Sequence, residues 1–307
     1  MNSQNYEKNK IHFFTYYLTF ELILALSTTV YAQVAYISEY AALQAEVSAA
    51  TGNKTIILTA NITGTTQLTI GRSLTIDLKG YNLTINTSDV YGLYVSDGRQ
   101  LSLDDSGGGK FNVNTTNTTD SAIGVYVVGS GSAATVTNAT ATNNGIGAYA
   151  YGGNLNVLGN AIGVTIGAFA REGASVEVHG NAESTSLIGG SGALAQTDYA
   201  TPATVIVRVN VKSAGANGSG AEARSVNAIV TVGGNSEATG LGGIGAQTTD
   251  GGSIIIYGSI TATTFVNVGS TPKTAAEYTD PPAPARTGFR TYTDDGTNIV
   301  WMKETAP

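Results

Sequence analysis

The sequence GAFAREGASVEVHGNAESTSLIGGSGALAQ, residues 167–196, decides the fold, because it contains two copies of one short motif. Each copy has a glycine, a small or apolar residue, any residue, and a second small or apolar residue. Copies begin at positions 92, 124, 147, 167, 192, 220 and 245, with a weaker one at 288. The last five of the seven begin 20, 25, 28 and 25 residues apart, and such a period is typical of stacked-repeat folds. The glycine would let the chain bend sharply at a corner.

Alternating runs follow most copies of the motif. Residues 175–178 (Ser-Val-Glu-Val) and 229–232 (Ile-Val-Thr-Val) are two examples, and each precedes a turn that contains glycine and asparagine. A two-residue period predicts strands with one buried side. One coil cannot bury its apolar side chains alone, so we expect coils to stack through parallel strands. The sequence predicts an all-β fold, a right-handed parallel β-helix (β-solenoid) with about three short strands per coil. A β-sandwich is the alternative.

Two runs before the repeats have the same character. They are 54–63 (Lys-Thr-Ile-Ile-Leu-Thr-Ala-Asn-Ile-Thr) and 73–85 (Ser-Leu-Thr-Ile-Asp-Leu-Lys-Gly-Tyr-Asn-Leu-Thr-Ile). With these runs and the motif copies, the chain resembles the pectin-lyase-like β-helix proteins, in particular non-enzymatic repeat regions of bacterial surface and adhesin-like proteins. The resemblance implies the right-handed β-helix fold. It also leaves a polysaccharide lyase or hydrolase of this class as an alternative function.

The composition excludes several classes of protein. The 307 residues include no cysteine, which excludes disulfides, thiolate metal sites and cysteine nucleophiles. The net charge is −7 and no basic stripe is present, so we expect no nucleic-acid partner. Hydrophobic residues make up 42% of the chain and are patterned, which predicts a folded protein rather than a disordered one.

The first 32 residues predict a secretory signal peptide. Polar residues 1–10 precede a mostly apolar stretch, and Val30 and Ala32 are small residues at the positions that a signal peptidase reads. We expect cleavage after Ala32 and no membrane span in the mature chain. An uncleaved anchor over 11–32 is the alternative. Because cysteine-free extracellular chains are common in bacteria, we expect a bacterial protein that is secreted or held at the cell surface.

The β-helix is expected over residues 33–269, beginning with an N-terminal capping helix. Apolar residues within 36–50 recur at three- and four-residue steps, which predicts one helical stripe, with Ser38 as N-cap and Gly52 as C-cap. Such a helix would cover the open end of the first coil, where an exposed sheet edge invites aggregation. The first strands are expected at 55–58, 67–70, 74–78 and 82–85.

The C-terminal part changes character. Residues 270–287 hold four of the six prolines and predict a linker or an extended segment on the solenoid surface. Residues 288–307 predict a hairpin that caps the solenoid. Trp301, the single tryptophan, is expected to plug the open end, and a sugar-stacking platform is the alternative.

Two pairs of residues are candidates for chemistry. Glu177 and His179 lie two apart on one alternating strand, so both face outward and could serve as a base and its orienting partner. Asp104 and Asp105 form an acidic doublet beside a glycine-rich turn, where paired carboxylates can bind calcium. For each pair the alternative is structural: two polar residues on the solvent side of a strand, and an ordinary turn.

The basic residues of the repeats, among them Arg171 and Arg224, lie on different coils with no obvious carboxylate cluster beside them. We therefore expect no catalytic residue, metal or other cofactor. The predicted function is a secreted or cell-surface structural module, adhesin-like, with binding residues on loops 114–121 and 197–204. Its partner would be a host surface or a polysaccharide. A groove with charged and aromatic residues across neighbouring coils would favour the enzyme instead.

Overall fold

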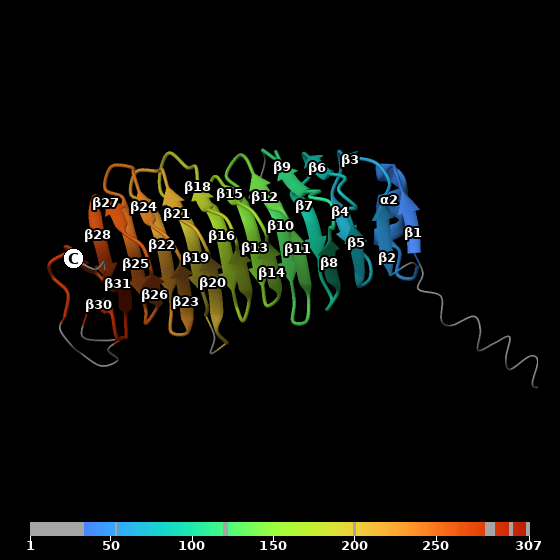
Figure 1. The fold of residues 1–307 in the computed structure, drawn as a ribbon. Coiled ribbons are helices and arrows are strands. Elements are labelled where there is room, and N and C mark those ends of the chain that lie inside the picture. The colour runs from blue at the N-terminus through green and yellow to red at the C-terminus, as the bar shows by residue number, and fades with distance from the viewer. Residues whose placement is uncertain are drawn as a thin grey trace, which may run out of the picture.

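The computed structural model describes residues 34–52, 54–118, 122–198, 201–279, 286–294 and 297–304. Within these ranges the chain forms an elongated stack of coils (Figure 1). The coils build three sheets, called A, B and C below, of twelve, nine and ten strands. Along the solenoid body each strand pairs in parallel with its counterparts in the preceding and following coils. The fold is therefore the predicted β-solenoid and not a β-sandwich.

The element bounds are as follows. Sheet A contains β1 (Val34–Ile37), β2 (Thr55–Leu58), β5 (Leu74–Asp77), β8 (Gln100–Asp104), β11 (Ala133–Val136), β14 (Asn154–Val157), β17 (Ser175–Val178), β20 (Ala203–Val207), β23 (Ala228–Val232), β26 (Ser253–Ile256), β31 (Ile299–Lys303) and β30 (Phe289–Thr293). Sheet B contains β3 (Ile62–Gly64), β6 (Leu83–Thr87), β9 (Phe111–Thr115), β12 (Asn138–Ala141), β15 (Ala161–Gly163), β18 (Ala182–Ser184), β21 (Val211–Ser213), β24 (Ser236–Ala238) and β27 (Ile260–Ala262). Sheet C contains β4 (Leu68–Ile70), β7 (Tyr91–Val95), β10 (Ile123–Val128), β13 (Ile146–Tyr151), β16 (Ile166–Arg171), β19 (Ser191–Gln196), β22 (Ser219–Arg224), β25 (Ile244–Thr249), β28 (Thr264–Val268) and β29 (Thr271–Lys273). The one helix in the described residues is α2 (Tyr40–Ser48).

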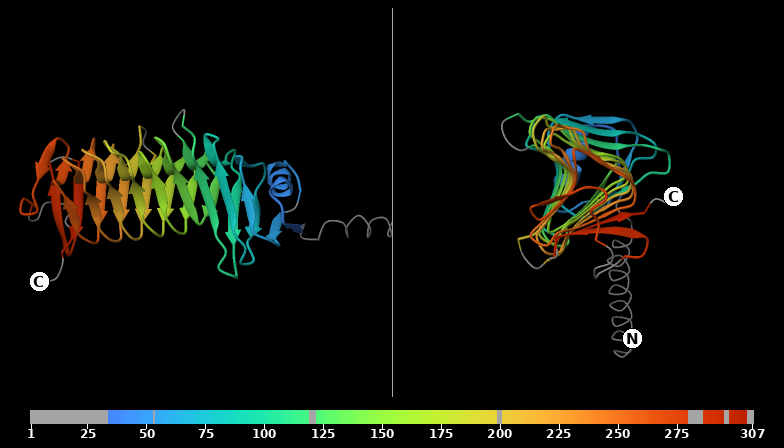
Figure 2. Two further views of the ribbon diagram at one scale, coloured as in Figure 1. Left: turned by 90° about the horizontal axis from the view of Figure 1, so that it is seen from above. Right: turned by 90° about the vertical axis from the view of Figure 1, so that its left-hand side faces the viewer.

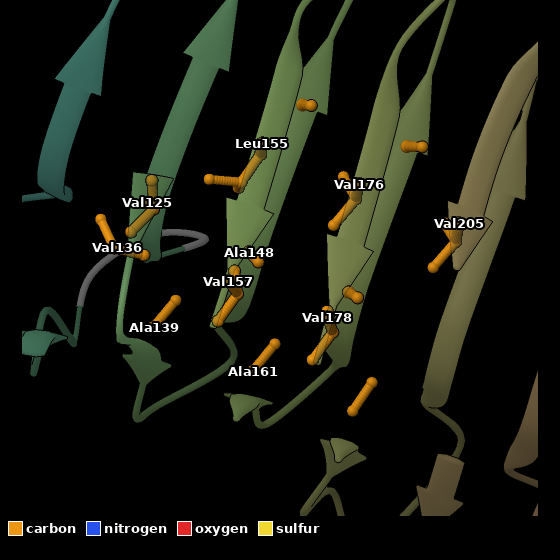
Figure 3. Packing of buried hydrophobic residues seen from close by; sticks show 14 of the residues in the cluster. Val125, Val136, Ala139, Ala148, Leu155, Val157, Ala161, Val176, Val178 and Val205 are labelled. Carbon is orange, nitrogen blue, oxygen red and sulfur yellow. The ribbon is translucent and has the colours of Figure 1, made fainter. Parts of the chain in front are cut away.

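The inward residues form continuous apolar columns. In sheet A, Val176 lies in register between Leu155 and Val205, and all three are buried (Figure 3). Burying one such valine side chain contributes about 1.5–3 kcal/mol relative to leaving it exposed. Each added coil extends the column, so stability accumulates along the stack.

Sheet C has a different inward column, made of alanine over five successive coils. Its members are Ala148, Ala168, Ala193, Ala221 and Ala246. Because alanine is small, sheet C can approach the opposite wall. Some Cα atoms of β16, in sheet C, and of β20, in sheet A, lie within 8 Å of each other. Seen along the axis, the sheet C side of the cross-section curves inward (Figure 2, right).

The glycines of the first seven motif copies lie where sheet C bends against sheet B, whereas Gly288 of the weaker copy precedes β30 of sheet A. A Cβ atom on Gly192 would lie 2.6 Å from the backbone nitrogen of Lys212 and 2.7 Å from the carbonyl oxygen of Gly220. Backbone atoms of neighbouring coils cannot move aside without breaking the ladder, so only glycine fits. This confirms the tight corner that the sequence predicts.

Asparagine side chains form a ladder along the turns between sheets A and B. The backbone N–H of Asn181 donates to Oδ1 of Asn160 at 2.8 Å, and that of Asn210 donates to Oδ1 of Asn181 at 3.1 Å. The next rung joins the backbone N–H of Asn235 to Oδ1 of Asn210 at 2.8 Å. Each side chain thus satisfies a backbone donor of the following coil at a turn, where no strand partner is present.

Helix α2 covers the N-terminal end of the solenoid and buries Leu43, as the sequence predicts. The predicted helix bounds are wrong at both ends. Residues 36 and 37 belong to β1, because residues 34–37 pair with β2 as an extra strand of sheet A. Glu39 rather than Ser38 occupies the N-cap position, and Ala49 rather than Gly52 follows the last turn. No side chain caps the helix N-terminus.

The C-terminal hairpin of β30 and β31 forms as predicted, and β31 extends sheet A beyond β26. The predicted plug is wrong. Trp301 lies in register with Ile255 on the outward side of the sheet, and Tyr292 is the fully buried aromatic residue at this end. Within the expected linker 270–287, β29 pairs antiparallel with β28 and so extends the edge of sheet C.

The predicted signal peptide, residues 1–32, lies outside the described residues. Among the described residues, no helix has the length and apolar character needed to cross a bilayer.

Candidate binding cleft on sheet C

The outward face of sheet C carries one continuous row of side chains that changes character along the axis. Its members, in register from coil to coil, are Tyr94, Tyr126, Tyr149, Phe169, Leu194, Glu222, Gln247 and Asn267. The first seven are the third residues of the first seven motif copies, so the alternation that turns the alanines inward turns this row outward. The row is aromatic toward the N-terminal end and polar toward the C-terminal end.

The aromatic half of the row is a column of stacked rings. The centroids of Tyr126 and Tyr149 lie 5.0 Å apart, and those of Tyr149 and Phe169 lie 4.7 Å apart at an interplanar angle of 7°. Because neighbouring rings cover each other's faces, the column presents ring edges to a ligand. Burial, together with the neighbouring phenols, raises the pKa of Tyr126 to about 12.

A cleft of about 370 Å³ lies on the polar half of the row, beneath the loops that lead from sheet B into sheet C. Its floor includes Leu194 and Glu222, and Thr165, Gly190 and Asn217 lie along the loop side. Glu222 is only 4% exposed and Leu194 only 3%, although both face outward. The inward curve of sheet C explains how outward side chains come to be buried.

Glu222 is the charged centre of the cleft. The hydroxyl of Ser191 donates to its Oε2 atom at 2.6 Å, and Nε of Arg224 donates to its Oε1 atom at 2.6 Å. A second polar pair lies beside it, in which the hydroxyl of Ser219 donates to Oε1 of Gln247 at 3.1 Å. Arg224 balances the carboxylate, so the cleft combines planar polar groups and hydroxyls with little net charge.

Another ionic cluster lies at the C-terminal end of β16 in sheet C. Arg171 forms an ion pair with Asp198, and Nε of Arg171 lies 3.7 Å from Oε1 of Glu172. The hydrogen bond to Asp198 raises the pKa of the Arg171 guanidinium, and the same bond lowers the pKa of the Asp198 carboxyl. The guanidinium also lies over the ring of Tyr151, 5.9 Å from its centroid. The expectation that the basic residues of the repeats have no carboxylates beside them is therefore wrong for Arg171 and Arg224. It is also wrong for Arg99, which pairs with Asp97, and for Arg208, which pairs with Glu177.

The loops above the cleft expose large apolar side chains. Leu187 is 88% exposed, and Leu241, two coils further along, is 84% exposed. Backbone hydrogen bonds join these loops through the coil between them, from Ala216 to Leu187 and from Asn217 to Leu241. The floor of the cleft thus combines Leu194 with polar groups, and the two exposed leucines lie on the loops beside it.

Glu177 and His179 lie on sheet A, away from this cleft. Both face outward, with Nε2 of His179 3.5 Å from Oε1 of Glu177. Arg208 of the next coil donates to the same Glu177 oxygen from Nε at 2.8 Å and from a terminal nitrogen at 2.6 Å. The Glu177 carboxylate is thus paired with the guanidinium of Arg208 on the solvent side of a strand. This arrangement also fits the alternative in which Glu177 and His179 are polar surface residues without a catalytic role.

Asp104 is the last residue of β8, and Asp105 begins the turn that follows it. Oδ1 of Asp105 accepts hydrogen bonds from the backbone N–H groups of Gly80 at 2.8 Å and Gly107 at 3.2 Å. Desolvation by burial raises the pKa of the Asp105 carboxyl, but the hydrogen bonds from these backbone N–H groups lower it by more. The net effect is a lowered pKa. Within the described ranges, no three His, Cys, Asp or Glu side chains are grouped as a metal site.

The two loops predicted to carry binding residues are only partly described, because 119–121 and 199–200 lie outside the described residues. In the first loop, Nδ2 of Asn117 donates to the Ser88 carbonyl at 2.8 Å and so packs the loop against the preceding coil. In the second, Asp198 joins the ionic cluster with Arg171.

Sequence reasoning missed Ser191, Glu222 and Arg224. A signal was available, since Glu222 is the only acidic residue at the third position of the first seven motif copies. Its contact with Ser191 joins residues 31 apart, on successive coils of unequal length, and motif spacing alone does not give that pairing.

Comparison of the chain with protein-family models, with curated proteins and with solved structures gave no match. The β-solenoid class therefore follows from the strand pairing itself.

Proposed function

We propose that this protein is a secreted or cell-surface β-solenoid that acts as an adhesin-like binding module and holds a polysaccharide on sheet C. The observation that carries the proposal is the cleft centred on Glu222 at the end of the aromatic column. Carbohydrate hydroxyls both donate and accept hydrogen bonds, and Glu222, Arg224 and Gln247 offer both kinds of partner.

The shape of sheet C supports an extended ligand. Its coils repeat at the strand spacing of about 4.8 Å, so a chain lying along the axis meets one row residue after another. A concave surface with a few fixed polar groups is the usual form of a small-ligand site. The near balance of charge in the cleft favours a neutral polysaccharide over a polyanionic one.

The number of carboxyl groups that line the cleft favours binding over hydrolysis. Glycoside hydrolases of the usual kind need two carboxyl groups, about 5–9.5 Å apart, beside the scissile bond. Among the described residues that line the cleft, only Glu222 carries a carboxyl group.

Affinity electrophoresis tests the proposal, with the purified protein run through gels that contain a neutral glucan, a neutral mannan, polygalacturonate or alginate. We expect retention by a neutral polysaccharide. Hydrogen bonds to charged groups contribute about 1.5–3 kcal/mol, so Glu222→Gln should weaken retention roughly tenfold or more. Glu177→Gln, a matched change on sheet A, should leave it unchanged. Equal effects of the two substitutions, or no retention by any of the four, would refute the proposal.

Polysaccharide cleavage is a second candidate, favoured by the nearly buried Glu222 beside Arg224 in an open cleft. Incubation with polygalacturonate and alginate, with and without calcium, would be followed through unsaturated products and reducing ends. Turnover that Glu222→Gln abolishes and Glu177→Gln leaves intact would establish this activity. Turnover lost in Glu177→Gln or His179→Ala would locate it on sheet A instead.

A further inference from the structure

Four tyrosines form one contiguous cluster at the N-terminal end of the outward row. Tyr91 and Tyr94 stack with centroids 5.5 Å apart, and Tyr126 lies 5.2 Å from Tyr91 and 5.8 Å from Tyr94. Tyr149 continues the cluster 5.0 Å beyond Tyr126. All four side chains are half-buried, so part of each remains open to solvent.

Tyr126 and Tyr149 have the best geometry of these pairs for direct ring coupling. They occupy equivalent positions on neighbouring parallel strands, and their rings are only 15° from parallel. Two nearly parallel rings with centroids 5.0 Å apart bring carbon atoms of the two phenols close together. The contacts of Tyr126 with Tyr91 and Tyr94 are tilted by 43° and 48°.

The column continues with a residue that cannot take part in phenol chemistry. Phe169 stacks on Tyr149 at 4.7 Å, but it has no hydroxyl from which a hydrogen atom can be removed. Along the stacked column, Tyr149 is therefore the last phenol, and Tyr126 is its stacked phenol partner. Tyr151 of the same strand also lies near enough to interact electrostatically with Tyr126 and Tyr149.

We propose that Tyr126 and Tyr149 form an oxidative modification site, at which a dityrosine bond joins two successive coils. A one-electron oxidant, such as a haem peroxidase with hydrogen peroxide, removes the hydroxyl hydrogen of each phenol as a proton and an electron. The unpaired electrons are shared with the ortho carbons, and two ortho carbons form a carbon–carbon bond. Each coupled carbon then loses its proton as the phenol is restored. The peroxide is reduced to two molecules of water, which balances the two hydrogens lost.

This modification is independent of the proposed polysaccharide binding. It would give a cysteine-free chain a covalent cross-link that needs no disulfide. The link closes a loop between positions 126 and 149, and closing a loop restricts the unfolded chain more than the folded one. The cross-linked protein should therefore unfold at a higher denaturant concentration.

The test oxidises the folded protein at low concentration with a haem peroxidase and hydrogen peroxide. Dityrosine fluorescence in the monomer fraction gives the yield. Trypsin places Tyr126 and Tyr149 in one fragment, 111–171, and Tyr91 and Tyr94 in another, 80–99. We expect fragment 111–171 to lose two hydrogens, and tandem mass spectrometry to find the link between positions 126 and 149.

Variants that keep the ring make the assignment specific. Tyr126→Phe and Tyr149→Phe should each abolish the link while retaining the solenoid circular dichroism spectrum. Tyr257→Phe, a matched change of an exposed tyrosine on sheet A, should leave the yield unchanged. Four results would overturn the proposal: a link that survives Tyr149→Phe, a link that joins fragments 80–99 and 111–171, dityrosine between molecules only, or equal yield in urea.

Discussion

Removing rungs of the asparagine ladder should destabilise the solenoid in steps. The variants are Asn160→Ala, Asn181→Ala and Asn210→Ala, singly and together. Each substitution removes one acceptor and leaves the backbone N–H of the following coil without its partner, at Asn181, Asn210 and Asn235 respectively. The backbone pairing of sheets A and B is untouched, so the effect isolates the ladder.

The magnitude follows from the burial of the rungs. A neutral hydrogen bond contributes about 0.5–1.5 kcal/mol net, and an unsatisfied buried donor costs about 1–3 kcal/mol. The rung atoms are half-buried or exposed, so we expect about 1 kcal/mol for each single variant. The three bonds involve separate donors and acceptors, so the triple variant should lose about 3 kcal/mol if the effects add.

Guanidinium unfolding followed by far-UV circular dichroism measures these losses. Asn181→Asp retains an acceptor oxygen at the same position and should remain close to the parent protein. Asn156→Ala is the matched control, because the buried Oδ1 atom of Asn156 has no hydrogen-bond partner. We expect the control to lose no stability, because the substitution removes an acceptor that makes no hydrogen bond. A triple variant as stable as the parent, or a control as costly as a rung, would refute the reasoning.

Three further predictions concern other parts of the solenoid. The raised pKa of Tyr126 means that the folded state holds this proton more tightly than the unfolded state. Stability should therefore fall as the pH rises from about 10 to about 12, and Tyr126→Phe should flatten that decline in a pH series of unfolding midpoints. Ala193→Leu overfills the inward column of sheet C and should cost about 1–3 kcal/mol in denaturant unfolding, whereas Thr204→Leu on the outward face of sheet A should cost far less. Leu43→Asp should dislodge α2, expose sheet edges and increase light scattering, and Ala42→Asp on the exposed side of the helix should not.

The repeat part of the fold was predictable because its signals are local. Alternation within runs such as 175–178 fixes which residues face inward, and the motif glycine fixes the corner, so strand positions and the three-sheet cross-section follow. The same local reasoning misplaced the start of α2. Ile37 has the spacing of the helical stripe that continues through Tyr40 and Leu43, but its pairing with β2 places it in a strand.

Trp301 shows where size alone misleads. A large aromatic residue near the chain end suggests a plug, but the register of β31 on β26 places Trp301 outward and Val300 inward. The hairpin partner supplies the buried ring instead, as Tyr292. Which side chains of a capping strand point inward depends on its register, because a shift of one residue reverses the two faces. The sequence of β31 alone does not specify that register.

By itself the sequence determined a stack of coils with apolar columns inside, because a two-residue alternation and a glycine corner are properties of neighbours in the chain. Only the tertiary structure decided that sheet C is concave, since this depends on how closely an alanine column lets two walls approach. The tertiary structure likewise brought Ser191 to Glu222 and Tyr126 to Tyr149. Because coil lengths vary along the chain, sequence spacing does not show which outward side chains are neighbours. The pairing of strands in successive coils determines these contacts.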